Sequence, residues 1–407
     1  MTQAPPSRAK YALILGGMTA FGPLCMDMYL PAFPAIAADL QAGASEVQLS
    51  LMACTMGLAL GQLVMGPMSD AVGRRRPLLI GVAIYVLASV LCALAPSAYA
   101  LAGIRLVQGF GGAAGIVIAR AVVRDLYSGV ALAKFFSMLM LVVGVVPIMA
   151  PVVGGQLLQL TSWRGVFVVL AVVGALLLAV ATFLLPETLP VQQRQPGSLG
   201  RTLRTFGGLL SDRLFTGFAL SASLAFAAMF AYISGSSFVL QDVYGMSAQT
   251  FGIVFAVNAI GIVAVGQLNG RLVGKADPRK MLAIGLGCNL LGALSVIVSV
   301  LGGIGLAGLL PALFVTVASV GLVMPNATAL SLSGRPETAG SASALLGVLQ
   351  FLVGGLASPL VGVAGSHTAV PMALVMAALS TLAVLVYLVL ARGQRTERPQ
   401  AAEATVG

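Results

Sequence analysis

Residues 61–81, GQLVMGPMSDAVGRRRPLLIG, place an apolar run on each side of a tight polar turn. A bilayer tolerates no unpaired backbone groups, so these runs predict membrane-spanning helices, and the arginine cluster between them predicts a cytoplasmic loop. The pattern recurs at residues 266–285, GQLNGRLVGKADPRKMLAIG, in the second half of the chain. We infer two homologous halves related by duplication, an organisation typical of transporters.

Composition supports a membrane protein, because 59% of the residues are hydrophobic and only 8% are charged, against about 25% charged in soluble domains. About 20 apolar residues are needed for each span. Breaking the chain at polar or Gly/Pro positions predicts twelve helices near 11–33, 47–69, 77–95, 98–120, 134–158, 164–185, 213–240, 247–271, 280–301, 304–330, 339–363 and 368–391. The expected fold is an all-α membrane protein with two pseudo-symmetric six-helix bundles, 1–185 and 213–391, a cytoplasmic linker, 186–212, and a polar tail, 392–407.

The distribution of charged residues predicts how the chain is oriented in the membrane. The net charge is +10, but all of the 22 Lys and Arg residues except Arg105 and Arg164 fall on one predicted side of the membrane. This asymmetry places both termini in the cytoplasm and argues against a nucleic-acid partner. The first ten residues lead into the first span without a small-residue cleavage pattern, so we expect this helix to be retained. The four cysteines show no paired spacing and His367 is the only histidine, so we expect no metal, no cofactor and no enzymatic activity.

Asp27 and Arg105 are the two charges well inside the predicted spans, at similar depth in helices 1 and 4. An intramembrane charge costs about 2.5–3.5 kcal/mol on insertion scales, so each is expected to face a cavity or a partner. We predict that the two form an ion pair used in proton coupling. The alternatives are a solvated Asp27 at the outer interface and a purely structural pair.

Helix 5 has a proline-rich and glycine-rich segment, LVVGVVPIMAPVVGGQL, that includes Gly144, Pro147, Pro151, Gly154 and Gly155. Each proline removes a backbone donor and pushes against the preceding turn. A simple kink would explain one proline. Two prolines four residues apart, with a Gly-Gly pair, favour a gating or sealing element.

Several motifs resemble the major facilitator superfamily. The loop motif Gly66-x-x-x-Asp70-x-x-Gly73-Arg74-Arg75 is similar to that superfamily's signature between helices 2 and 3, and Arg105 with Gln108-Gly109 to its helix 4 motif. Residues 150–155, APVVGG, resemble the antiporter motif of its drug exporters. Residues 27–34 (DMYLPAFP), 124–127 (RDLY) and 232–241 (YISGSSFVLQ) resemble the bicyclomycin and chloramphenicol resistance (Bcr/CflA) subfamily.

The resemblance implies alternating access, in which an external proton is exchanged for a cytoplasmic drug. Thr19 stands where some related exporters carry a second acid, so coupling would rest mainly on Asp27. It also suggests that Asp70 contacts the start of helix 11, near residues 338–341, and that Arg74 reaches Asp125. We expect these contacts only while the cytoplasmic mouth is shut, which would make them a latch. The alternative is that the arginines only determine topology.

The leading interpretation is a monomeric, proton-coupled exporter of small, largely apolar drugs in a bacterial inner membrane. A nutrient or metabolite permease of the same fold is the alternative, and a non-transporting receptor or scaffold belongs to another class. The partners expected are the drug, protons and the lipid bilayer. Candidate residues of the substrate cavity are Tyr29, Gln108, Phe230, Tyr232 and Asn258.

Overall fold

The structure is a computed structural model that describes residues 8–194, 199–333 and 338–391, apart from residues 364 and 366. Its described residues contain twelve helical spans long and apolar enough to cross a membrane, which confirms the predicted number and the all-helical fold class. The spans begin and end within a few residues of the predicted limits, except that the first extends to Asp39 and the fourth to Leu126. The predicted tail at 392–407 lies outside the described residues.

The N-terminal half begins with a helix that is interrupted twice. Prolines stand in the first turn of its last two segments, η1 and α3, where a missing N–H costs least. The elements of this half are α1 (Arg8–Thr19), α2 (Phe21–Asp27), η1 (Leu30–Ala32), α3 (Phe33–Asp39), α4 (Ala44–Val72), α5 (Arg75–Ala93), α6 (Ala98–Leu126), α7 (Gly129–Leu160) and α8 (Trp163–Leu184).

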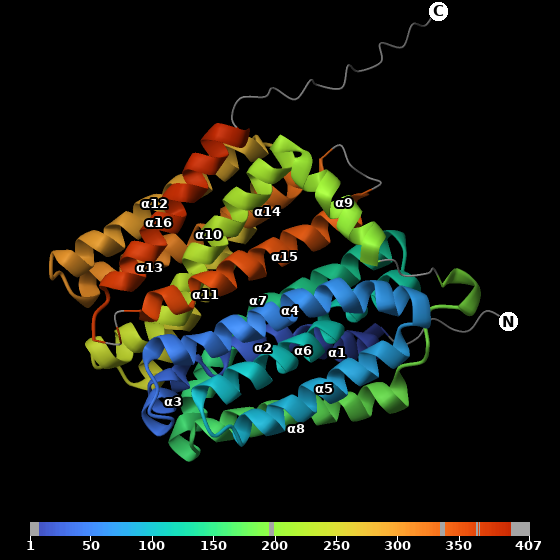
Figure 1. Ribbon diagram of the computed structural model, residues 1–407. Coiled ribbons are helices and arrows are strands. Elements are labelled where there is room, and N and C mark those ends of the chain that lie inside the picture. Colours follow the sequence, from blue (N-terminus) through green and yellow to red (C-terminus); the bar gives the residue numbers. More distant parts are fainter. Residues whose placement is uncertain (1–7, 195–198, 334–337, 364, 366, 392–407) are drawn as a thin grey trace, which may run out of the picture.

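The C-terminal half repeats six spans, some of which are again interrupted. Its elements are α10 (Arg213–Phe238), η3 (Val239–Val243), α11 (Ala248–Leu272), α12 (Pro278–Leu301), α13 (Leu306–Ala318), α14 (Val320–Leu332), α15 (Ala339–Ala357), η5 (Pro359–Gly362), α16 (Val370–Val386) and η6 (Tyr387–Ala391). In Figure 1 these helices lie above those of the first half. Helix α4 packs against α15 and α7 against α11, so these two pairs join the halves.

The segment between the halves contains a helix that the sequence did not lead us to expect. After the short η2 (Val191–Gln193), α9 (Leu199–Ser211) turns Phe206 and Leu209 inward. These side chains pack against α10 and against Ala342, Leu345 and Leu346 of α15. The linker therefore docks on the C-terminal half.

Side-chain hydrogen bonds between the halves gather at the ends of the helices that the charge pattern places outside. In the N-terminal half, Ser45 donates to Pro359 O and Gln48 to Ser234 O, at 3.0 and 3.1 Å. From the other half, the donors Ser237, Gln241 and Gln249 bond the carbonyl oxygens of Leu30, Pro31 and Gly155. We call this set the outer junction. These bonds hold the two halves together at the predicted outer ends, so we call this conformation outer-closed.

Candidate functional site

Arg105 lies on α6 with none of its surface exposed. One terminal nitrogen of the guanidinium donates to Cys25 O at 2.6 Å and the other to Gln108 Oε1 at 2.5 Å. The guanidinium also stacks over the Tyr29 ring, 4.2 Å from its centroid. Charge-assisted hydrogen bonds and cation–π contacts are strong where water is excluded, so this cation is held firmly inside the N-terminal half.

Asp27 ends α2, and only 7% of its surface is exposed. Among the described residues its carboxylate makes no hydrogen bond or ion pair, so the predicted pair with Arg105 is wrong for this conformation. The physical reason is the interruption of the first span. Because α2 ends at Asp27, the carbonyl of Cys25 belongs to the last turn, whose carbonyls lack helical donors, and the guanidinium satisfies it instead.

Asp27 nevertheless sits near the boundary between the halves. It interacts electrostatically with Tyr232 of α10, on the other side of that boundary. Two residues after Asp27, Tyr29 is fully buried under Arg105, and its hydroxyl lies 3.3 Å from Ser50 Oγ. The carboxylate is thus buried at the break in the first span, close to the boundary between the halves.

The five predicted cavity residues are all buried, and the structure divides them between the two halves. Tyr29 and Gln108 surround Arg105, and Gln108 also donates to Ser89 Oγ at 2.7 Å. On the other side, Asn258 donates to the Tyr232 hydroxyl at 2.8 Å. Phe230 packs against Phe226 with ring centroids 5.2 Å apart. A role of these residues in holding substrate stays a prediction.

The loop between α4 and α5 forms an ion-pair cluster around Arg74. Arg74 Nε donates to Asp125 Oδ2 at 2.9 Å, and a terminal nitrogen binds Asp70 and donates to Ser69 Oγ. The expected contact between Arg74 and Asp125 is confirmed. It forms inside the N-terminal half. That it requires a shut cytoplasmic mouth stays a prediction.

The other half of the expected latch is not formed in this conformation. Asp70 has a side chain 52% exposed and pairs with Arg74, and no described residue of the segment 338–341 hydrogen bonds to it. Gly66 is in ordinary contact, since an added Cβ would lie 3.6 Å from Val117. Gly73 adopts φ +108°, where a side chain would also strike the Glu187 carboxylate at 2.5 Å.

Glu187 is a site residue that the sequence reasoning missed. Its carboxylate accepts the backbone N–H groups of Arg74, Arg75 and Leu189 at 2.8, 3.1 and 3.0 Å, which places a negative charge at the N-terminus of α5. Burial raises the pKa of Glu187, but these hydrogen bonds outweigh burial and hold the pKa below its usual value. The sequence did offer a signal that could have identified Glu187, because it is an acidic residue on the side of the membrane where most Lys and Arg residues are predicted to lie.

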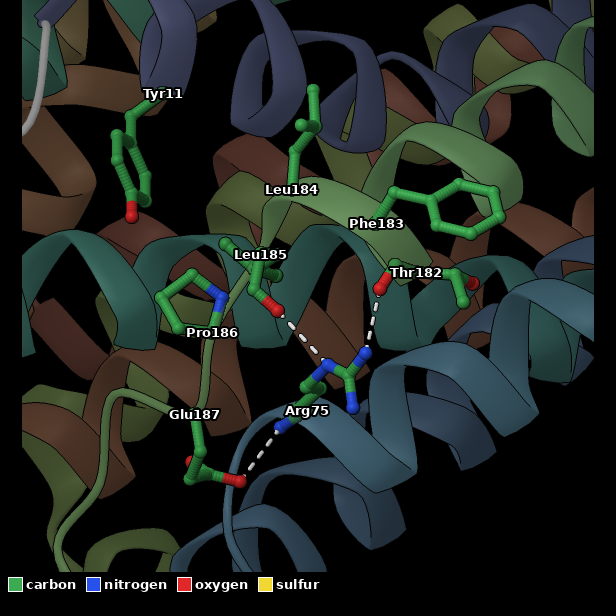
Figure 2. Close-up of a pocket in the computed structure, with 8 residues that line it drawn as sticks. All are labelled: Tyr11, Arg75, Thr182, Phe183, Leu184, Leu185, Pro186 and Glu187. Atoms are coloured by element: carbon green, nitrogen blue, oxygen red, sulfur yellow. Dashed lines mark hydrogen bonds between the residues drawn. The ribbon is translucent and has the colours of Figure 1, made fainter.

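Figure 2 shows how this segment is fastened to α8. The Arg75 side chain donates to Leu185 O at 2.9 Å and to Thr182 O at 2.6 Å, at the C-terminal end of α8. These residues line a shallow pocket together with Tyr11 and Glu187. Cations near a helix C-terminus are favourable, so Arg75 ties the start of α5 to the end of α8.

The predicted helix 5 motif lies on α7, which contains both Pro147 and Pro151. Its glycines permit very close approach: a Cβ on Gly154 would lie 1.9 Å from Met28 O, and one on Gly155 would lie 2.7 Å from Ala248 O. Gly144 is less crowded, with Val263 at 3.6 Å. The Gly-Gly pair therefore packs α7 against the first span and against α11 of the other half.

Comparison with known proteins matches residues 15–359 to the family model described as Major Facilitator Superfamily. A Bacillus subtilis protein described as the uncharacterized MFS-type transporter YdgK is 43% identical and aligns over 91% of this chain and 92% of its own. A Haemophilus influenzae bicyclomycin resistance protein homolog is 33% identical, over 93% and 95% of the two chains. A Pseudomonas aeruginosa chloramphenicol resistance protein is 30% identical, over 92% and 89%.

A similar fold occurs among solved structures. A bacterial homolog of the human lysosomal transporter Spinster, in an inward-facing and occupied conformation, superposes with a TM-score of 0.77. The two chains are 18% identical, and the match covers 95% of this chain and 97% of the other. At this identity the likeness concerns the fold alone.

Proposed function

Because this chain belongs to the major facilitator superfamily, and within it to the bicyclomycin and chloramphenicol resistance (Bcr/CflA) subfamily, we propose that it exports small, largely apolar drugs from the bacterial cytoplasm in exchange for protons. Relatives named for resistance to bicyclomycin and chloramphenicol support a drug as the substrate. Inward movement of one proton supplies about 2.3 kcal/mol per 100 mV of membrane potential. That free energy drives the drug outward against its gradient.

The observation that carries the proposal is the unpaired, buried carboxylate of Asp27. An ionised carboxylate without a partner is costly to bury, and protonation removes this cost. Arg105 is engaged by Cys25 O and Gln108, so it does not neutralise Asp27 in the outer-closed conformation. A proton arriving from outside and released to the cytoplasm would therefore change the stability of the two conformations of the carrier.

Alternating access also requires contacts between the halves that can break, and the outer junction supplies them. Its five side-chain hydrogen bonds end on backbone carbonyls of the opposite half, so they can all be released when the halves rock apart. Asp27 lies three residues before Leu30, whose carbonyl accepts one of these bonds. Its protonation state can thus bias the junction through a short, interrupted stretch of the first span.

A reconstituted flux assay tests this function. The full chain is placed in proteoliposomes that contain a pH-sensitive dye, and chloramphenicol is added to create a drug gradient. We expect drug-dependent proton movement with the native protein and its loss in Asp27→Asn, at equal insertion. Equal proton movement with Asp27→Asn would refute the role of Asp27, and no drug-dependent movement with any subfamily drug would refute exchange.

The matched control is Asp277→Asn. Asp277 is exposed and caps α12 through Arg279 N at 2.8 Å. Asparagine is as good as aspartate at such a position, so this variant removes the same charge and keeps the cap. We expect native flux from it, which separates the loss of a proton carrier from the loss of any carboxylate.

A further inference from the structure

Two buried thiols meet beside Arg105. Cys25 on α2 and Cys54 on α4 have no exposed surface, and their sulfur atoms lie 3.6 Å apart. The other two cysteines, Cys92 and Cys288, have no thiol contact among the described residues. The pair is therefore distinguished from ordinary buried cysteines by its geometry, and the proposed exchange of drug for protons makes no use of it.

The two sulfur atoms differ in their freedom to move. Cys54 is anchored, because α6 approaches α4 so closely that a Cβ on Gly109 would lie 2.1 Å from Cys54 O. Cys25 stands in a seven-residue helix with a break at each end, and besides its contact with Cys54 its thiol donates to Gly22 O at 3.1 Å. A disulfide requires a sulfur–sulfur distance of about 2.05 Å. Rotation of the Cys25 side chain and a small shift of α2 can close the remaining gap.

A cation also lies beside the pair. The Arg105 guanidinium donates to the backbone oxygen of Cys25 at 2.6 Å, which places a positive charge close to the pair. Its Nε has no partner among the described residues, although it is completely buried. Reactive thiols in proteins sit next to such cations, because the thiolate is the nucleophile.

We propose that Cys25 and Cys54 are an oxidation site, which a peroxide converts reversibly into a disulfide that ties α2 to α4. One thiolate attacks a peroxide oxygen to give a sulfenic acid. The oxygen–oxygen bond breaks, and the other peroxide oxygen takes up the proton released by the thiol and leaves as water. The second thiol attacks the sulfenic sulfur, the sulfur–sulfur bond forms, and a second water leaves. Two thiols are oxidised by two electrons in total and one peroxide is reduced.

The test counts free thiols on the full-length protein in nanodiscs. After treatment with hydrogen peroxide, the protein is denatured, alkylated with N-ethylmaleimide and weighed. The native chain has four cysteines; we expect four labels before oxidation, two after it, and four again after dithiothreitol. Peptide mapping should join Cys25 to Cys54. Four labels after peroxide, or sulfinic acid on a single cysteine without a disulfide, would overturn the proposal.

Serine variants provide matched controls that keep the size of the side chain. Cys25→Ser and Cys54→Ser should each keep all of their remaining thiols after peroxide. Cys92→Ser removes another buried thiol of the same half, and it should still lose two labels. Loss of two labels in Cys54→Ser would place the disulfide elsewhere and refute the assignment. None of these readouts depends on transport, so they stand apart from the proposed function.

Discussion

Gly155 offers a direct test of how the outer side closes. A Cβ at this position of α7 would lie 2.7 Å from Ala248 O of α11, and one on Gly252 of α11 would lie 2.8 Å from Pro151 O of α7. Ordinary contact begins near 3.4 Å. Gly155→Ala therefore forces the two helices, one from each half, to move apart.

The magnitude follows from overpacking, which costs about 1–3 kcal/mol for an added methyl group in a tight contact. The contact joins the halves, so the cost acts in the outer-closed conformation and is relieved when that side opens. A cost of this size shifts a two-state equilibrium about 5- to 150-fold. We expect Gly155→Ala to raise the ratio of outer-open to outer-closed molecules by that factor.

Spin labels report this ratio. Positions 43 and 304 are exposed and lie at the outer ends of opposite halves, so cysteines placed there in a background without native cysteines give the interspin distance. The longer-distance population should grow in Gly155→Ala and in Gly252→Ala. Gly287→Ala, on α12 with no atom within 4 Å of the added Cβ, is the control and should leave the distribution unchanged. Unchanged distances in both junction variants would refute the reasoning.

Three further predictions concern the charged groups. Arg105→Ala removes two buried charge-assisted hydrogen bonds of about 1.5–3 kcal/mol each, so we expect it to lower the thermal stability and the drug flux more than Arg105→Lys does; equal effects would show that the charge is unimportant. Glu187 has a lowered pKa when folded, so its stabilising effect is present above the unfolded value of about 4.3 and is lost as the pH falls through the folded value. The Tm difference between native protein and Glu187→Gln should thus shrink from pH 7 to pH 4, and a difference that does not change with pH would contradict this. Asp70→Ala should lower flux without changing membrane orientation, and a cysteine crosslink between positions 70 and 340 should form only when the outer side is open; a crosslink equally frequent in both states would remove the latch.

Helix positions could be read from the sequence because the bilayer imposes a simple requirement. About 20 apolar residues must cross it as a helix that satisfies its own backbone, and this requirement is local. Helix α9 escaped prediction because it does not cross. Its apolar residues Phe206 and Leu209 find partners on the neighbouring α10 and on α15, which is distant in sequence.

The buried charges of the candidate site could be identified from the sequence, but their pairings and the part played by Glu187 could not. A charged residue inside an apolar span is rare and costly, so Asp27 and Arg105 could both be identified as candidate site residues from the sequence. Depth alone suggested that they pair. The structure instead gives Arg105 the Cys25 carbonyl, because the first span breaks at Asp27 and leaves acceptors there.

The twelve spans and the identity of the buried charges were thus determined by the sequence itself, since each depends on hydrophobicity and charge along the chain. The tertiary structure decided the partners of those charges, the hydrogen bonds from the loop backbone to Glu187, and the contact between Cys25 and Cys54. Each is a contact of a few ångströms between helices, and such contacts depend on where a helix breaks and how closely its glycines let a neighbour approach.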